Sequence, residues 1–78
     1  MSYDLALRAM LVDRWYAETI TLDETRELRS YFREDIERVK RAGGPEKTLA
    51  RLIMLDTAVS AKEYLAEMIA SAKVADGG

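Results

Sequence analysis

The 78-residue sequence contains no cysteine and no histidine. Without cysteine the chain has neither a disulfide nor a thiolate ligand for zinc, which fits a reducing compartment. Without histidine it lacks the commonest metal ligand and the commonest general base in catalysis. Its four serines are better explained as helix caps or helix-surface residues than as nucleophiles, because none lies in a turn motif that would expose its hydroxyl for catalysis. We therefore predict no metal site, no cofactor and no enzymatic activity.

Proline and glycine are also scarce, and no long hydrophobic run is present. The sequence has one proline and four glycines, and its 49% hydrophobic and 33% charged residues are typical of a compact helical domain. No run approaches the roughly 18 apolar residues of a membrane span, and the N-terminus does not read as a signal peptide. We expect a cytoplasmic protein without a membrane partner.

The small size of the chain points to association. We predict one domain over residues 1–78, ending in a frayed tail over residues 75–78. A single core at this length is marginal, and without a disulfide or metal the remaining source of stability is a partner or a second copy.

A first helix is predicted over residues 3–17, with Ser2 as its N-cap. Two apolar stripes run along it. Leu5, Ala9, Val12 and Tyr16 form one stripe, and Leu7, Met10 and Leu11 form the other. Either both stripes belong to the core of a tight bundle, or the second is a contact surface for a partner.

A second helix is predicted over residues 22–42. Thr21 and Glu24 match a capping box at its start, and Gly43 suits the left-handed residue after its end. One face is apolar at helical spacing, and the other carries charge pairs such as Glu34 with Arg38. The apolar face consists of Leu28, Tyr31, Phe32, Ile36 and Val39.

A third helix is predicted over residues 45–74. The consecutive apolar residues Leu52, Ile53, Met54 and Leu55 point in all directions on a helix, which predicts burial in the middle of the bundle. A second capping-box match at Ser60 leaves open a break into two helices near residues 57–60. A longer apolar series favours a single helix. It consists of Met54, Ala58, Ala61, Leu65, Met68 and Ala72.

The fold class predicted from these elements is all-α, a small antiparallel bundle of three helices, the last of which is long. Charge is divided along the chain. Residues 26–51 carry eight basic and five acidic side chains, whereas residues 1–25 carry two and five and residues 52–78 two and four. The basic middle can complement the acidic ends within the chain or meet an acidic partner.

The function we expect is protein–protein interaction, as an adaptor or an inhibitor of a larger assembly. Compact, mildly acidic, cysteine-free chains of this size occur among phage-encoded inhibitors of host systems, anti-CRISPR proteins included, although this is an analogy of composition alone. One alternative is a homodimer or other homo-oligomeric subunit. Another is a nucleic-acid-binding module that uses the basic stretch from Arg26 to Arg51. The candidate contact residues are Leu7, Leu11, Trp15, Arg29, Arg33, Arg38, Lys40, Arg41, Lys47 and Arg51.

Overall fold

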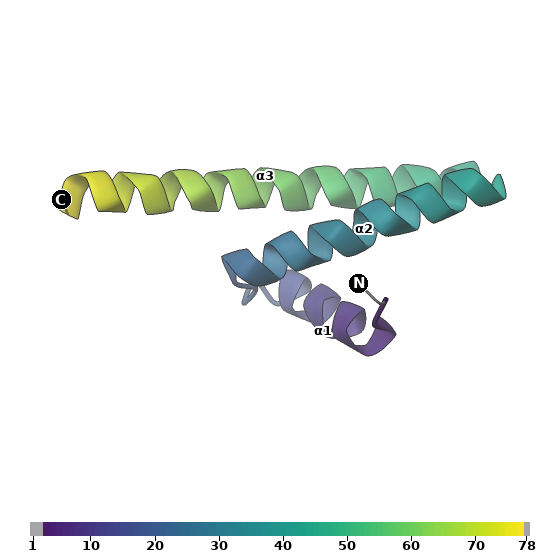
Figure 1. The fold of residues 1–78 in the computed structure, drawn as a ribbon, viewed down its shortest axis with the longest axis horizontal. Helices are drawn as coiled ribbons and strands as arrows, with labels where there is room; N and C mark the ends of the chain where they lie inside the picture. Colours follow the sequence, from purple (N-terminus) through teal and green to yellow (C-terminus); the bar gives the residue numbers. More distant parts are fainter. Residues whose placement is uncertain (1–2, 78) are drawn as a thin grey trace.

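A computed structural model describes residues 3–77 of the chain and the side chains of residues 3–73. Within that part there are three helices and no strand, so the all-α fold class is confirmed (Figure 1). Helix α1 spans Leu5–Tyr16, α2 spans Leu22–Ala42 and α3 spans Glu46–Gly77.

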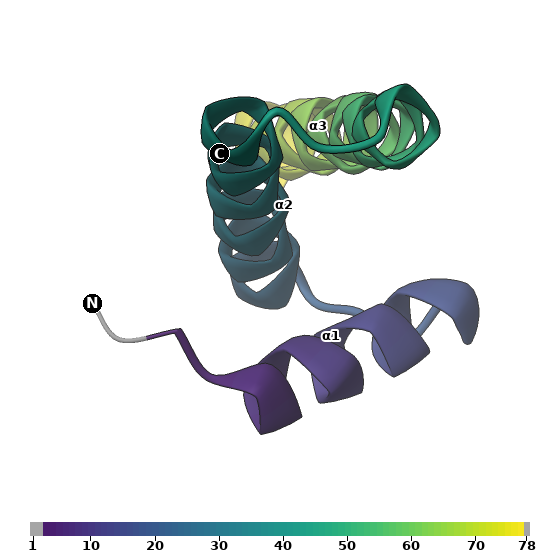
Figure 2. The ribbon, with the colours of Figure 1, turned by 90° about the vertical axis from the view of Figure 1, so that its right-hand side faces the viewer.

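Helix α2 lies at the centre of the fold. Helix α3 runs antiparallel along it, and α1 packs against another side of α2, as the two views show (Figures 1 and 2). The molecule measures 50 × 24 × 22 Å, with a radius of gyration of 14.5 Å. A compact domain of this length would have a radius of gyration of about 11.5 Å. The helices therefore form an elongated, open arrangement in which α3 sets the long dimension.

Helix α2 begins and ends at the predicted residues. The Glu24 amide donates to Thr21 Oγ1 at 3.2 Å, and the Thr21 amide donates to Glu24 Oε1 at 3.0 Å, which completes the capping box. The hydrogen bond from the Thr21 amide holds the pKa of Glu24 below its ordinary value. Gly43 ends the helix with φ of 63°, in the left-handed region that glycine adopts without strain.

Helix α1 begins later than predicted. Asp4 is its N-cap and accepts a hydrogen bond from the Leu7 amide at 3.1 Å, whereas Ser2, the predicted cap, lies outside the described residues. The helix ends at Tyr16, and Glu18 then takes a φ of 60° as the chain turns toward α2.

The core lies where all three helices contribute side chains. Its largest fully buried side chains are Phe32, Leu11, Leu28 and Val59. Leu7 packs against this cluster, while Leu5 and Tyr16 on the other stripe of α1 are exposed. The interpretation of Leu11 as a partner contact is therefore wrong, because this side chain is buried where α1 packs on α2, and Leu7 lies half-buried beside it.

Helix α3 is continuous through residues 57–60. The Thr57 hydroxyl donates to the Ile53 carbonyl at 2.9 Å, so this polar side chain is satisfied inside the helix. The helix extends to Gly77, beyond the predicted end at residue 74, and so takes in residues 75–77 of the expected frayed tail. Gly78 lies outside the described residues.

The prediction that residues 52–55 are buried on all sides is wrong. Leu52 is buried and Leu55 is half-buried, but Ile53 and Met54 are exposed. The physical reason is the position of α3 at one side of α2, because a helix with neighbours on one side can bury only that side.

Candidate protein-interaction surface

The outward side of α3 carries an uninterrupted exposed apolar stripe. We call it the outer stripe, and it consists of Met54, Ala58, Ala61, Leu65, Met68 and Ala72. All six residues are exposed, and the three large ones retain 73% (Met54), 56% (Leu65) and 51% (Met68) of their accessible surface. No charged residue interrupts the stripe over these positions.

Helical geometry explains why this stripe faces solvent. At 100° per residue its members fall within an arc of roughly 80°, on the side opposite Leu52, Val59 and Glu63, the buried residues that face α2. Viewed along the long axis, α2 and α1 both lie away from the upper and outer side of α3 (Figure 2). Neither helix covers the outer stripe.

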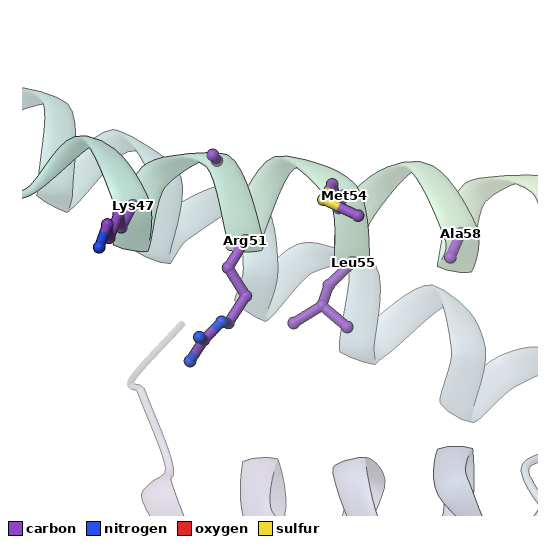
Figure 3. A pocket seen from close by; sticks show the side chains of 6 residues that line it. Lys47, Arg51, Met54, Leu55 and Ala58 are labelled. Atoms are coloured by element: carbon purple, nitrogen blue, oxygen red, sulfur yellow. The ribbon is translucent and has the colours of Figure 1, made fainter.

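Further apolar side chains border the outer stripe, and cations mark one end of it. Tyr64 and Ile69 are exposed on its two flanks, and Lys47 and Arg51 lie just before Met54 at the N-terminal end. A hollow lies along this end of α3. In the view of Figure 3 the Arg51 and Leu55 side chains extend below the helix, and Met54 lies near its upper edge. The hollow is lined by Lys47, Ala50, Arg51, Met54, Leu55 and Ala58.

An exposed apolar stripe of this length is uncommon on a small monomeric protein. Apolar residues scattered singly over a surface need no explanation, but contiguous patches mark sites of contact with another macromolecule. The outer stripe is therefore the candidate functional site. From the sequence alone, the spacing of this series indicates one long helix but does not show that the series is exposed.

The arginines of α2 are largely engaged within the molecule. Arg26 Nη2 donates to Glu67 Oε1 at 2.8 Å, Arg29 pairs with Glu63, and Arg33 Nε lies 3.5 Å from Asp56 Oδ1. The hydrogen bond to Glu67 raises the pKa of Arg26. The basic middle of the chain thus pairs with carboxylates of α3, as one of the two sequence interpretations predicted.

A fourth arginine of α2 joins a cluster around the buried Asp35. The Tyr3 hydroxyl donates to Asp35 Oδ1 at 2.6 Å, Arg8 Nε donates to Oδ2 at 3.0 Å, and Arg38 Nη1 lies 3.6 Å from Oδ1. The Arg38 guanidinium also lies 4.6 Å from the centroid of the Tyr3 ring. The cluster ties the segment before α1 to α2. Sequence reasoning missed it because Tyr3 and Arg8 lie 32 and 27 residues before Asp35 in the chain.

Burial and electrostatics in this cluster act on the Tyr3 hydroxyl. Burial raises the pKa of Tyr3 above its ordinary value of 10, and the hydrogen bond to the negatively charged Asp35 raises it further. The guanidinium groups of Arg8 and Arg38 act in the opposite direction. The neutral phenol is therefore the form that the folded structure favours.

The other predicted contact residues fall into two places. Trp15 is half-buried against the core, and the Lys62 ammonium lies 5.1 Å from its ring centroid. Lys40, Arg41, Lys47 and Arg51 are exposed around the turn between α2 and α3, and none has an ion pair within the described part of the chain. Of the eight basic residues between Arg26 and Arg51, four are therefore paired within the molecule. The other four remain for contact with a nucleic acid.

Among residues 3–73, whose side chains the structure describes, no three carboxylates gather where they could hold a metal ion. Nor is any helix of that part both long and apolar enough to cross a membrane.

No protein-family model, curated protein or solved structure matches this chain. The argument for function therefore rests on the geometry of the outer stripe.

Proposed function

We propose that the protein is a non-enzymatic interaction module of the cytoplasm that binds another polypeptide through the outer stripe of α3. The observation that carries this proposal is the exposure of Met54, Leu65 and Met68 on the side of α3 opposite its packing face. Removing apolar surface from water is worth about 25 cal/mol per Å², so a partner that covers the stripe gains free energy directly.

The form of the module supports the same function. The stripe lies on one straight helix of 32 residues, and a rigid helix presents its side chains to a partner at little cost in conformational entropy. An adaptor and an inhibitor of a larger assembly, including the phage-encoded kind, would both use such a surface.

Site-specific photocross-linking in the cells that natively contain the chain tests this proposal. A photoreactive phenylalanine analogue at position 65 lies in the outer stripe, and the same analogue at the exposed Glu37 of α2 provides the control. We expect an adduct with a polypeptide from position 65 and none from position 37. If position 65 gives no adduct while both variants keep their helix content, the proposal is wrong.

A further inference from the structure

We propose that the outer stripe binds a second copy of this chain, with the two α3 helices packed antiparallel about a two-fold axis near residue 63. The inference rests on the proposed function, because it assigns an occupant to the same surface. Four features of α3 support it: the spacing of the stripe, the sizes of its side chains, the charges at its ends and the hollow beside it.

The spacing of the stripe is that of a coiled-coil seam. Successive members from Met54 to Ala72 are separated by four, three, four, three and four residues. This alternation is the a and d pattern of a heptad repeat, with Ala58, Leu65 and Ala72 at one position and Met54, Ala61 and Met68 at the other. Two such helices pack side by side over a long seam.

Side-chain size selects the register. With the axis near residue 63, each layer of the seam joins one large and one small residue, as close packing between facing positions requires. The layers are Met54 with the partner's Ala72, Ala58 with the partner's Met68, and Ala61 with the partner's Leu65.

Other arrangements of the same seam pack worse. Shifting the antiparallel register by one heptad pairs Leu65 with Met54 and Ala58 with Ala61, and it brings Arg51 against Met68. A parallel pair would stack identical residues, so that Leu65 meets Leu65 and Ala61 meets Ala61. Both arrangements alternate crowded layers with empty ones, which costs free energy through strain and through voids.

The charges at the ends of α3 also favour the antiparallel pair. Lys47 and Arg51 lie in the first turns of α3, where the helix dipole disfavours cations, and the last turn has no basic residue. In the proposed register Arg51 falls opposite residue 75 of the partner, close to the negative end of its dipole. A parallel pair would instead bring the four cations of the two copies together.

The partner fills the hollow at the N-terminal end of α3. In this register its Met68 lies against Ala58 and its Ile69 against Leu55, two residues that line the hollow. Tyr64 meets its own copy across the axis on the other flank. Lys62, also near the axis, has its ammonium over the Trp15 ring of its own chain, which draws it away from the seam.

Disulfide trapping tests both the partner and the register, because the natural sequence has no cysteine. We would mix an Ala58→Cys chain with a Met68→Cys chain under mild oxidation and separate the products without reductant. The proposal predicts a mixed disulfide between the two variants. Either variant alone should form no disulfide between its two copies, because the two cysteines of that dimer lie about 15 Å apart along the seam, well beyond bridging distance.

Further mixtures distinguish the alternatives. If Ala58→Cys formed its mixed disulfide with Ala61→Cys and not with Met68→Cys, the register would be the one shifted by a heptad, and the proposed register would be wrong. Efficient disulfides of Ala58→Cys with itself would overturn the antiparallel arrangement.

Light scattering coupled to size exclusion tests the association itself. We expect a dimer, and we expect Leu65→Glu to raise its dissociation constant by about a hundredfold or more, because it buries two carboxylates in the seam. Ile53→Glu is the matched control, since Ile53 is an exposed apolar residue of α3 outside the outer stripe, and it should leave the dimer intact.

The two proposals fail in different ways. A folded monomer at every accessible concentration, with no mixed disulfide, would show that a second copy of the chain does not cover the outer stripe. If position 65 then cross-links a different polypeptide in cells, the interaction module stands without the dimer. If it cross-links nothing, both proposals fall.

Discussion

Glu63 of α3 and Arg29 of α2 form an ion pair between the two longest helices. The Glu63 side chain is 9% exposed and that of Arg29 is 29% exposed. The pair lies one helical turn from Arg26 and Glu67, whose side chains are each more than 40% exposed. The two neighbouring pairs thus differ mainly in burial.

We predict that Glu63→Gln lowers the free energy of unfolding by about 1–3 kcal/mol, because it leaves the partly buried Arg29 without a charged partner. Glu67→Gln should change it far less, since exposed ion pairs gain little over their hydration. Urea denaturation of the two variants checks this difference. Equal effects would show that burial does not set the strength of these pairs.

The two stripes of α1 should respond in opposite ways to truncation. Leu11→Ala opens a cavity in the core and should cost about 2–5 kcal/mol, whereas Leu5→Ala removes an exposed side chain and should cost less than about 0.5 kcal/mol. Thermal unfolding followed by circular dichroism gives both values. A larger loss for Leu5→Ala would mean that α1 packs on α2 through its other side.

Stability should fall at alkaline pH through Tyr3. The folded state raises the pKa of Tyr3 above its unfolded value of about 10, so the folded chain holds this proton more tightly than the unfolded chain does. The contribution is fully present below pH 10 and is lost as the pH rises through the folded pKa. Denaturation between pH 8 and pH 11 should show this loss in the natural chain and a shallower one in Tyr3→Phe. Identical slopes in the two chains would contradict the prediction.

The turn between α2 and α3 should be sensitive at Gly43. Its φ of 63° is left-handed, so Gly43→Ala should cost about 1–2 kcal/mol through backbone strain alone, because nothing lies within 4 Å of a Cβ atom there. Gly43→Asn should cost less, since asparagine tolerates this conformation better. Melting temperatures of the two variants test this order, and a stability of Gly43→Ala equal to the natural chain would refute it.

The parts of the fold that the sequence predicted well are governed by local signals. Thr21, Glu24 and Gly43 fix the ends of α2 through hydrogen bonds and backbone geometry within a few residues, and the bounds agree with the structure. The pair between Glu34 and Arg38, one turn apart, is likewise present at 3.8 Å. The counting of charges along the chain also anticipated that α2 and α3 complement each other.

The parts that the sequence could not predict depend on which side of a helix meets its neighbour. In α1 both stripes have the correct spacing, and only the packing of Leu11 on α2 decides between them. In α3 the apolar residues surround the helix, so periodicity cannot distinguish the buried Val59 from the exposed Leu65. The candidate site is the side of α3 that remains exposed after packing. Its heptad spacing can be read from the sequence, but that spacing does not show which side of the helix faces away from α2.

The length of α3 has a consequence for the shape of the particle in solution. A helix of 32 residues is about 48 Å long, so α3 alone accounts for nearly all of the molecule's 50 Å extent. Two copies joined along that helix would double the mass and lengthen the particle by only a few ångströms. The particle would thicken much more than it lengthens, and the frictional ratio would fall, so that the assembled protein tumbles as a rounder body than the single chain.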